Sequence, residues 1–256
     1  MDNIQKKQDD EYEFPYHYVS QFRNGFTQVF NDTWGINYVS TIEYIIEQLK
    51  HERFNSLIDM GCGDGRLVRE LSREFPNQAI CGIDYSSQAI GLAKIMNRDC
   101  EYYQADITSQ LVKKADLITL IEVFEHVPPE MANNFVDGIH HHLNDGGVLY
   151  ITVPHENKPV EYKHYRHFNS KTITECFNDR FFIEGIIPFE SNGIMKYIID
   201  IILTNRLFIL NNQRLKNYIY NFYKRNLFLV ENESECNRLF VKAVKKRLNF
   251  LSLSQQ

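Results

Sequence analysis

Ser56-Leu57-Ile58-Asp59-Met60-Gly61-Cys62-Gly63-Asp64-Gly65 is the stretch of sequence that decides the fold. Apolar residues run into a turn with three glycines, and residues 66–75 then carry apolar side chains at helical spacing. This pattern predicts a buried strand, a tight turn and a helix, which together open a nucleotide-binding α/β unit. Glycine at these turn positions allows the tight turn and lets the backbone approach a ligand closely.

Further apolar segments downstream predict four more strands. Their ranges are 78–83, 100–105, 116–121 and 148–153. The first two end in Asp84 and Asp106, and an acid about 20 residues past the turn suits the hydroxyls of a ribose. The third ends in Glu122-Val123-Phe124-Glu125-His126, and the last follows Asp145-Gly146-Gly147.

The combined pattern resembles the class I S-adenosylmethionine-dependent methyltransferases over roughly residues 53–190. The residues that carry the resemblance are Asp59-x-Gly61-x-Gly63-x-Gly65, Asp84, Asp106 and Gly146-Gly147. The resemblance implies an α/β fold with a Rossmann-like seven-stranded sheet in the order 3-2-1-4-5-7-6. It also implies S-adenosylmethionine as the cofactor, bound where strands one and four are neighbours at the switch point of the sheet.

The resemblance assigns each part of the cofactor to a part of this chain. The glycine turn would hold the methionine part, Asp84 the ribose, and Asp106 with Ile107 the adenine. The implied cofactor-binding residues are Asp59, Gly61, Gly63, Gly65, Asp84, Tyr85, Asp106, Ile107 and Glu122. Capping of a turn or helix is the alternative role of Asp84 and Asp106.

Four segments are expected along the chain: an N-terminal tail, lid and helix (1–52), the cofactor-binding core (53–190), a helical insertion (191–235), and the last strand with a tail (236–256). The aromatic residues of 12–26 either pin the N-terminus to the core or form a lid over the substrate. Apolar positions predict an amphipathic helix at 38–49. The insertion is expected to shape the acceptor side of the pocket or to form a homodimer contact.

The composition of the chain indicates which partners and which cellular compartment to expect for the protein. The net charge of −5 over 256 residues argues against broad nonspecific binding to nucleic acid. The five cysteines show no zinc-binding spacing, and no signal peptide is visible, so a reducing cytoplasm is expected. Charged and polar residues interrupt the apolar stretch 194–210, which therefore does not read as a membrane span.

Glu122, Glu125 and His126 stand at positions i, i+3 and i+4 and would share one face of a helical turn. Two carboxylates and an imidazole can bind a divalent ion, and His164 or His167 could supply a fourth ligand. This Glu-x-x-Glu-His pattern is similar to those of ubiquinone-pathway O-methyltransferases and small-RNA 2′-O-methyltransferases. Mg²⁺ or Mn²⁺ is expected, with other divalent ions open. A metal-free histidine base and a purely structural motif are the alternatives.

The preferred function is an S-adenosylmethionine-dependent O-methyltransferase that acts on a small-molecule hydroxyl, such as a sugar, a nucleotide-linked intermediate or a phenol. The expected catalytic residues are His126, His167 and Glu122. The expected substrate contacts are Tyr16, His17, His155 and Tyr165. An RNA 2′-O-methyltransferase is the main alternative, although only Lys242, Lys245, Lys246 and Arg247 form a small basic end. A dinucleotide oxidoreductase and a noncatalytic partner-binding paralogue are less consistent with the residues.

Overall fold

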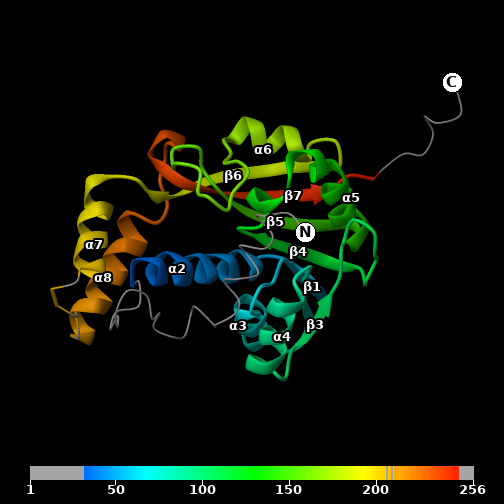
Figure 1. Cartoon of the computed structure of the whole chain (residues 1–256), viewed down its shortest axis with the longest axis horizontal. Helices are drawn as coiled ribbons and strands as arrows, with labels where there is room; N and C mark the ends of the chain where they lie inside the picture. Colours follow the sequence, from blue (N-terminus) through cyan, green and yellow to red (C-terminus); the bar gives the residue numbers. More distant parts are fainter. Residues whose placement is uncertain (1–31, 206, 209, 211, 248–256) are drawn as a thin grey trace, which may run out of the picture.

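Seven strands form a single sheet in the computed structural model, which describes residues 32–205, 207–208, 210 and 212–247. The strands are β1 (Ser56–Met60), β2 (Ala79–Asp84), β3 (Glu101–Gln104), β4 (Ala115–Ile121), β5 (Leu143–Pro154), β6 (Phe181–Ser191) and β7 (Cys236–Lys245). Their order is β3-β2-β1-β4-β5-β7-β6, which confirms the expected order (Figure 1). Strands β1 to β5 pair in parallel, and β7 runs antiparallel to both β5 and β6.

Helices flank both faces of this sheet (Figure 1). They are α2 (Asp32–Leu49), α3 (Arg66–Glu74), α4 (Ser87–Met96), α5 (Ala132–His142), α6 (Ser170–Phe177), α7 (Ile194–Thr204) and α8 (Gln213–Asn226), with 3₁₀ turns η1 (Phe124–His126), η2 (Pro129–Met131) and η3 (Glu233–Glu235). The Ser86 hydroxyl caps α4 by accepting from the Ala89 N–H at 3.2 Å, and Asn169 caps α6 in a capping box. The predicted aromatic lid at 12–26, with Tyr16 and His17, lies outside the described residues.

Two boundaries differ from the sequence-based expectation. The helix at 38–49 begins earlier, at Asp32. The strand expected over 148–153 begins earlier, at Leu143, directly after α5 ends at His142. Residues 144–147, expected to separate helix from strand, belong to β5, because Leu143 already pairs with Ala115 across a register shift. Such an irregularity absorbs the extra residues without ending the ladder.

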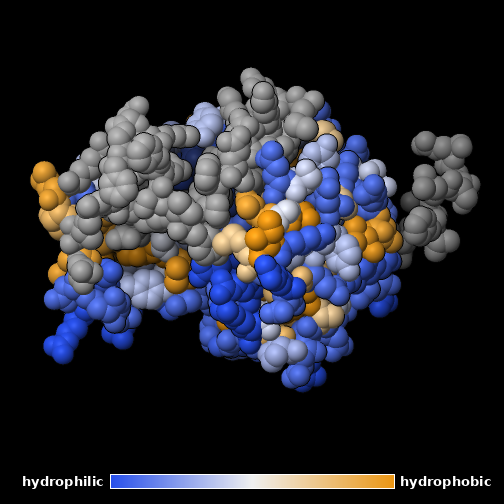
Figure 2. Space-filling model, turned by 60° about the horizontal axis from the view of Figure 1, so that its bottom comes forward, coloured by the Kyte–Doolittle hydropathy of each residue, from blue (hydrophilic) through white to orange (hydrophobic). Residues whose placement is uncertain are grey.

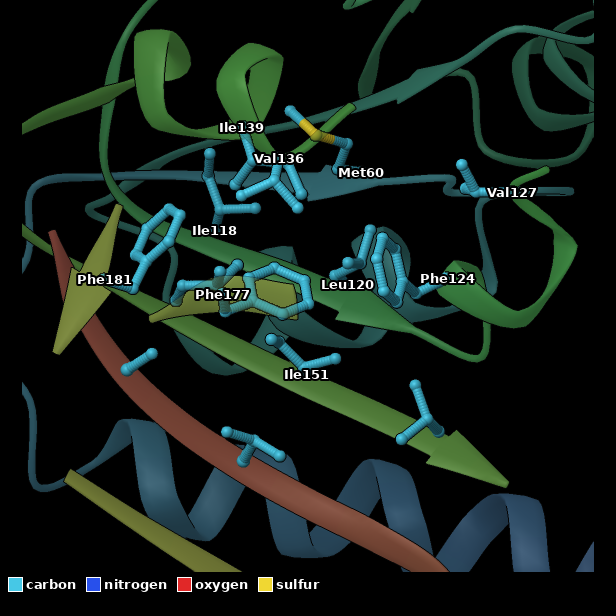
Figure 3. Packing of buried hydrophobic residues seen from close by; sticks show 14 of the residues in the cluster. Met60, Ile118, Leu120, Phe124, Val127, Val136, Ile139, Ile151, Phe177 and Phe181 are labelled. Carbon is cyan, nitrogen blue, oxygen red and sulfur yellow. The ribbon is translucent and has the colours of Figure 1, made fainter. Parts of the chain in front are cut away.

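The core consists of two clusters, one on each face of the sheet. Successive residues of β5 illustrate the division, because Leu149 and Ile151 join the first cluster while Tyr150 joins the second. Figure 3 shows the first cluster, in which side chains of the central strands pack against those of α5 and α6. The insertion supplies buried side chains to the second cluster together with α2: Ile199, Leu203, Tyr223, Leu227 and Phe228. The insertion is therefore part of the packed structure.

Among the residues that the structure describes, no helix combines the length and the apolar character needed to cross a bilayer.

Candidate active site

A cavity of about 500 Å³ lies at the carboxyl ends of the parallel strands. Its walls come from the segments that follow β1, β2, β3 and β4, from the loop at 161–165, from α2 and from β7. In an open α/β sheet this is the place where ligands bind, because the strand order reverses there between β1 and β4. The size is within the range of small-molecule and cofactor sites.

The glycine turn forms one wall of this cavity and requires glycine for two reasons. Gly61, Gly63 and Gly65 have φ angles of +76°, +54° and +79°, a region that side chains disfavour. A Cβ atom at Gly61 would also lie 2.4 Å from Cγ2 of Val123, and one at Gly65 would lie 2.4 Å from the Tyr102 hydroxyl. The turn therefore brings bare backbone to the cavity wall, as the sequence predicted.

Asp84 fastens this turn to the start of α4. Its Oδ2 accepts a hydrogen bond from the Gly63 N–H at 2.9 Å, and its Oδ1 accepts from the Ser86 N–H at 2.8 Å. The carboxylate thus has the local structural role that the sequence left open, and it also lines the cavity. Tyr85 lies beside it at the rim, with 56% of its surface exposed.

Asp106 faces the cavity from the end of β3. Its Oδ1 accepts from the backbone N–H and from the hydroxyl of Thr108, at 2.9 and 2.7 Å. Within the described part of the chain no hydrogen bond reaches its Oδ2, which is free to accept from a ligand. Ile107 is buried beside it, and its carbonyl oxygen lies 2.4 Å from where a Cβ atom at Gly138 would stand. A glycine in α5 therefore lets the helix approach this wall closely.

Asp59 is the most deeply buried acid of the cofactor-binding set, with 3% of its surface exposed. Burial raises its pKa to about 7, and the hydrogen bond from the Thr119 hydroxyl at 2.8 Å opposes this rise. The nearby Asp84 carboxylate raises the pKa further. A positively charged group bound in the cavity would favour the ionised form of Asp59.

The prediction that Glu122, Glu125 and His126 share one face of a helical turn is wrong. Glu122 keeps its backbone N–H on the Thr152 carbonyl of β5, at 3.0 Å, and has a φ of +55°, so the 3₁₀ turn η1 begins only after it. Its carboxylate points to Arg238, whose Nε lies 2.8 Å from Oε2. Burial acts to raise the pKa of Glu122, but Arg238 lowers it on balance.

Glu125, His126 and His164 do come together. One ligand atom of each lies within 4.8 Å of the others, and Glu125 is 1% exposed. Among the described residues, neither oxygen of Glu125 has a hydrogen-bond partner. Burial, followed by the charge of Glu122, raises the pKa of Glu125 well above that of an ordinary glutamate. A buried carboxylate without partners is costly, and a bound cation would compensate it.

An aromatic cluster holds η1 in place beneath this group. Phe124 is fully buried, and its ring stacks on Phe168 at 5.4 Å and packs against Phe177 at 4.9 Å. Figure 3 shows Phe124 and Phe177 in this packing, next to the central strands. The guanidinium of Arg166 lies 5.2 Å from the Phe124 ring centre. Phe124 thus anchors the turn that presents Glu125 and His126.

Backbone carbonyls fix the tautomers of His126 and His167, and His167 in turn fixes that of His164. Nδ1 of His126 lies 3.0 Å from the Lys163 carbonyl, which can only accept, so the neutral ring keeps a lone pair on Nε2. Nδ1 of His167 likewise donates to the Lys158 carbonyl at 3.0 Å, and its Nε2 accepts from Nδ1 of His164 at 2.8 Å. His164 is thereby left with its lone pair on Nε2. Burial and the neighbouring histidines lower the pKa of His164 to about 3, which keeps it neutral.

His167 is therefore a partner of His164 rather than a member of the group of three. Of the other predicted substrate residues that the structure describes, Tyr165 lines the cavity and His155 does not. Tyr165 lines the cavity, and its backbone N–H donates to the Glu125 carbonyl at 2.9 Å. His155 does not line it, because its Nε2 pairs with Glu233 at 3.0 Å and its Nδ1 accepts from a backbone N–H.

Arg238 and Glu190 are site residues that sequence reasoning missed. Arg238 lines the cavity and also contacts the Glu190 carboxylate, which accepts from Asn37 of α2 at 2.9 Å and lies 3.4 Å from Nζ of Lys196 in α7. Within the described ranges, Glu122 and Glu190 are the two non-glycine residues with positive φ. Both strained glutamates thus bind one arginine. The sequence feature that could have pointed to Arg238 is its charge directly before the apolar stretch 239–241.

Comparison with known proteins places this geometry in a family. A family described as Methyltransferase domain matches residues 38–184, more than half of the chain. Trans-aconitate 2-methyltransferase from Escherichia coli is 30% identical over 113 residues, which cover 43% of either chain. The chain spans less than half the length of the first curated relatives that it matches.

Two solved structures share the fold across nearly the whole chain. N-methyltransferase NodS from Bradyrhizobium japonicum, in complex with S-adenosyl-L-homocysteine, has a TM-score of 0.59 at 12% identity and covers 96% of this chain and 100% of its own. Magnesium protoporphyrin IX methyltransferase from Synechocystis PCC 6803, with bound S-adenosylmethionine, has a TM-score of 0.60 at 14% identity and covers 96% and 98%. The chain belongs to the methyltransferase domain family and has the fold of the class I S-adenosylmethionine-dependent methyltransferases.

Proposed function

We propose that the protein is an S-adenosylmethionine-dependent O-methyltransferase that acts on a small-molecule hydroxyl. The observation that carries this proposal is the cavity at the switch point, where the glycine turn, Asp84 and Asp106 meet Glu125, His126 and His164. The first set has the chemistry to hold the cofactor and the second to activate an acceptor. S-Adenosylmethionine supplies a methyl group on a positively charged sulfur.

The cofactor-side residues fit that group by their hydrogen-bonding chemistry. We expect the Asp84 carboxylate, which lines the cavity beside the glycine turn, to accept hydrogen bonds from the ribose hydroxyls. Asp106 can accept from the adenine amino group through Oδ2, with Ile107 against the ring. The turn at Gly61 to Gly65 offers backbone alone, which allows the methionine part to lie close to it.

A divalent ion held by Glu125, His126 and His164 is the second part of the proposal. The hydrogen bonds at Nδ1 direct the Nε2 lone pair of each imidazole toward this group, and Glu125 supplies a buried carboxylate that has no hydrogen-bond partner among the described residues. Two imidazoles and a carboxylate favour Mn²⁺, Fe²⁺, Co²⁺ or Zn²⁺ over Mg²⁺. Such an ion lowers the pKa of a hydroxyl that it binds. In this arrangement Glu122 is not a ligand, since it pairs with Arg238, and His167 orients His164.

The metal-free alternative uses the same residues. Nε2 of His126 would then accept the proton of the acceptor hydroxyl, and Nδ1, donating to the Lys163 carbonyl, would hold the ring in orientation. The RNA alternative has less support, because its basic end is engaged within the protein. Lys242 pairs with Glu52 and Glu184 at 2.6 and 3.1 Å, and Nζ of Lys245 donates to the Leu143 carbonyl at 2.6 Å.

One experiment tests the function and the metal separately. Purified protein is given radiolabelled S-adenosylmethionine and a set of small hydroxyl compounds, with and without a chelator, and its metal content is measured by mass spectrometry. We expect methyl transfer that the chelator abolishes and Mn²⁺ restores. Glu125→Gln and His164→Ala should lose the metal but keep cofactor affinity, whereas His141→Ala, an exposed histidine on α5, should change neither.

The outcomes separate the alternatives. Transfer that is insensitive to the chelator, by protein that contains no metal, would leave His126 as a general base. Absence of cofactor binding by calorimetry would reject the methyltransferase proposal as a whole. Transfer to RNA alone would replace the small-molecule acceptor.

A further inference from the structure

The outer face of α7 is apolar although it lies in solvent. Ile194, Tyr197, Ile198 and Ile201 stand at positions i, i+3, i+4 and i+7 and are 80%, 65%, 42% and 49% exposed. The opposite face of the same helix is apolar as well, since Ile199 belongs to the second core cluster. A helix that is apolar on both faces is normally covered on both. One face of α7 therefore lacks a cover among the described residues.

Two further exposed side chains follow α7 in the chain. Leu207, in the connection to α8, is 93% exposed, and Tyr218 of α8 is 68% exposed. Figure 2 shows hydrophobic residues at the left end of the molecule, the end at which Figure 1 places α7 and α8. We call the six residues Ile194, Tyr197, Ile198, Ile201, Leu207 and Tyr218 the hairpin surface. Exposed apolar residues that gather on one part of a surface often mark a site of interaction with a protein or a membrane.

The charge of this region differs in sign from that of the protein. Residues 192–230 contain six Lys or Arg and one Asp, a net charge of +5, so the rest of the chain carries −10 against the total of −5. Two of the six cations are already paired, Lys196 with Asp200 at 2.7 Å and Lys224 with Glu43 of α2, so the exposed arginines of α8 remain to face a partner. Arg214, Tyr218 and Arg225 are exposed and follow one stripe of α8. Basic and aromatic side chains thus accompany the apolar face.

We infer that the hairpin surface docks on an anionic lipid membrane. Apolar residues beside basic and aromatic ones are the composition of helices that lie in the interface of a bilayer, with aliphatic side chains among the acyl chains and cations against phosphates. A second copy would bring two surfaces of the same positive charge together. Nucleic acid would use the cations but leave the isoleucines uncovered.

The hairpin surface lies on a helix that packs against one wall of the cavity. Helix α7 packs on α2, and α2 lines the cavity with Asn37, Tyr38, Thr41 and Ile42. Docking would therefore place the cavity near the membrane. The inference does not depend on methyl transfer, because it rests on exposure and charge alone.

Flotation of the full chain with lipid vesicles tests the inference. Vesicles of phosphatidylcholine alone are compared with vesicles that contain about 30% phosphatidylglycerol, at low and high salt. We expect binding to the anionic vesicles only, weakened by salt. Ile198→Glu with Ile201→Glu should lower the partition coefficient by on the order of tenfold or more, since two apolar contacts are lost. Arg214→Glu with Arg225→Glu should lower it by at least about fivefold for each cation removed.

Matched controls place the same substitutions elsewhere on the surface. Ile95→Glu on α4 replaces an isoleucine that is 69% exposed, and Lys171→Glu on α6 reverses a charge whose side chain is 83% exposed. Both should bind as the wild type does, and melting temperatures confirm that all variants fold. No binding to anionic vesicles at low salt would overturn the inference, as would equal losses in the controls. A wild-type dimer that Ile201→Glu dissociates would assign the surface to a second copy, and salt-dependent RNA binding lost in the arginine variant would assign it to RNA.

Discussion

Replacing Arg238 by methionine should lower the free energy of unfolding by about 3 kcal/mol at neutral pH. The Arg238 side chain lies between two carboxylates, Glu190 with 5% of its side chain exposed and Glu122 with 30%. Removal of one partner of a buried ion pair costs about 3–5 kcal/mol, because the other charge loses its compensation. We expect the lower end, since water in the cavity can hydrate Glu122 and Lys196 stays 3.4 Å from Glu190. The melting temperature should fall by roughly 6–12 °C.

The size of this loss should depend on pH. In the wild type the pKa of Glu122 is lowered, so the group contributes stability above its unfolded pKa, and this stability is lost as the pH falls through the folded pKa. In Arg238→Met burial still raises the pKa of Glu122, while the main groups that oppose it are reduced to Lys158 and Thr152, so the variant should lose stability as the pH rises. The difference between the two proteins should therefore be largest near neutral pH and shrink on acidification.

Urea unfolding followed by circular dichroism, from about pH 5 to pH 8, measures this difference. Arg238→Met with Glu122→Gln is the matched control, because it removes the carboxylate that titrates. We expect the double variant to recover part of the stability at neutral pH and to show a flatter pH dependence than Arg238→Met. A loss that is the same at every pH would refute the reasoning, since it would mean that Arg238 acts through packing rather than charge.

The remaining predictions concern two residues on the cofactor side of the cavity and one glycine of α4. Asp84→Ala should weaken S-adenosylmethionine binding in calorimetry by about 10- to 100-fold, because charge-assisted hydrogen bonds worth roughly 1.5–3 kcal/mol are lost. Unchanged affinity would remove the ribose assignment. Gly61→Val should abolish binding or folding, because its Cβ would lie 2.4 Å from Val123 and its φ is +76°. Gly91→Ala, where the helical glycine has no neighbour within 4 Å, should instead raise the stability by about 0.5–1 kcal/mol in the same unfolding assay.

Much of the fold and of the cofactor side was readable from local sequence. Strands β1, β2, β4 and β5 contain apolar segments that are buried within the sheet, and each strand up to β5 ends close to its predicted position. The turn at Gly61 to Gly65 was predictable because positive φ angles select glycine. Asp84 and Asp106 follow their strands directly, so the parallel direction of β2 and β3 brings both to one edge of the sheet. Local patterns suffice where neighbours in sequence are neighbours in space.

The acceptor side depended on contacts between distant segments. Helical spacing predicted a shared face for Glu122 and Glu125, but the ladder to β5 and the ion pair with Arg238, 116 residues away in the chain, turn Glu122 aside. The same tertiary packing brings His164, and not His167, within 4.8 Å of Glu125 and His126, and the Lys158 carbonyl fixes the tautomer of His167 and so that of His164. Sequence determined which residue types reach this edge of the sheet. Only the tertiary structure decided which carboxylate has no hydrogen bond among the described residues, because the partner of a buried charge is the opposite charge that the fold brings within reach.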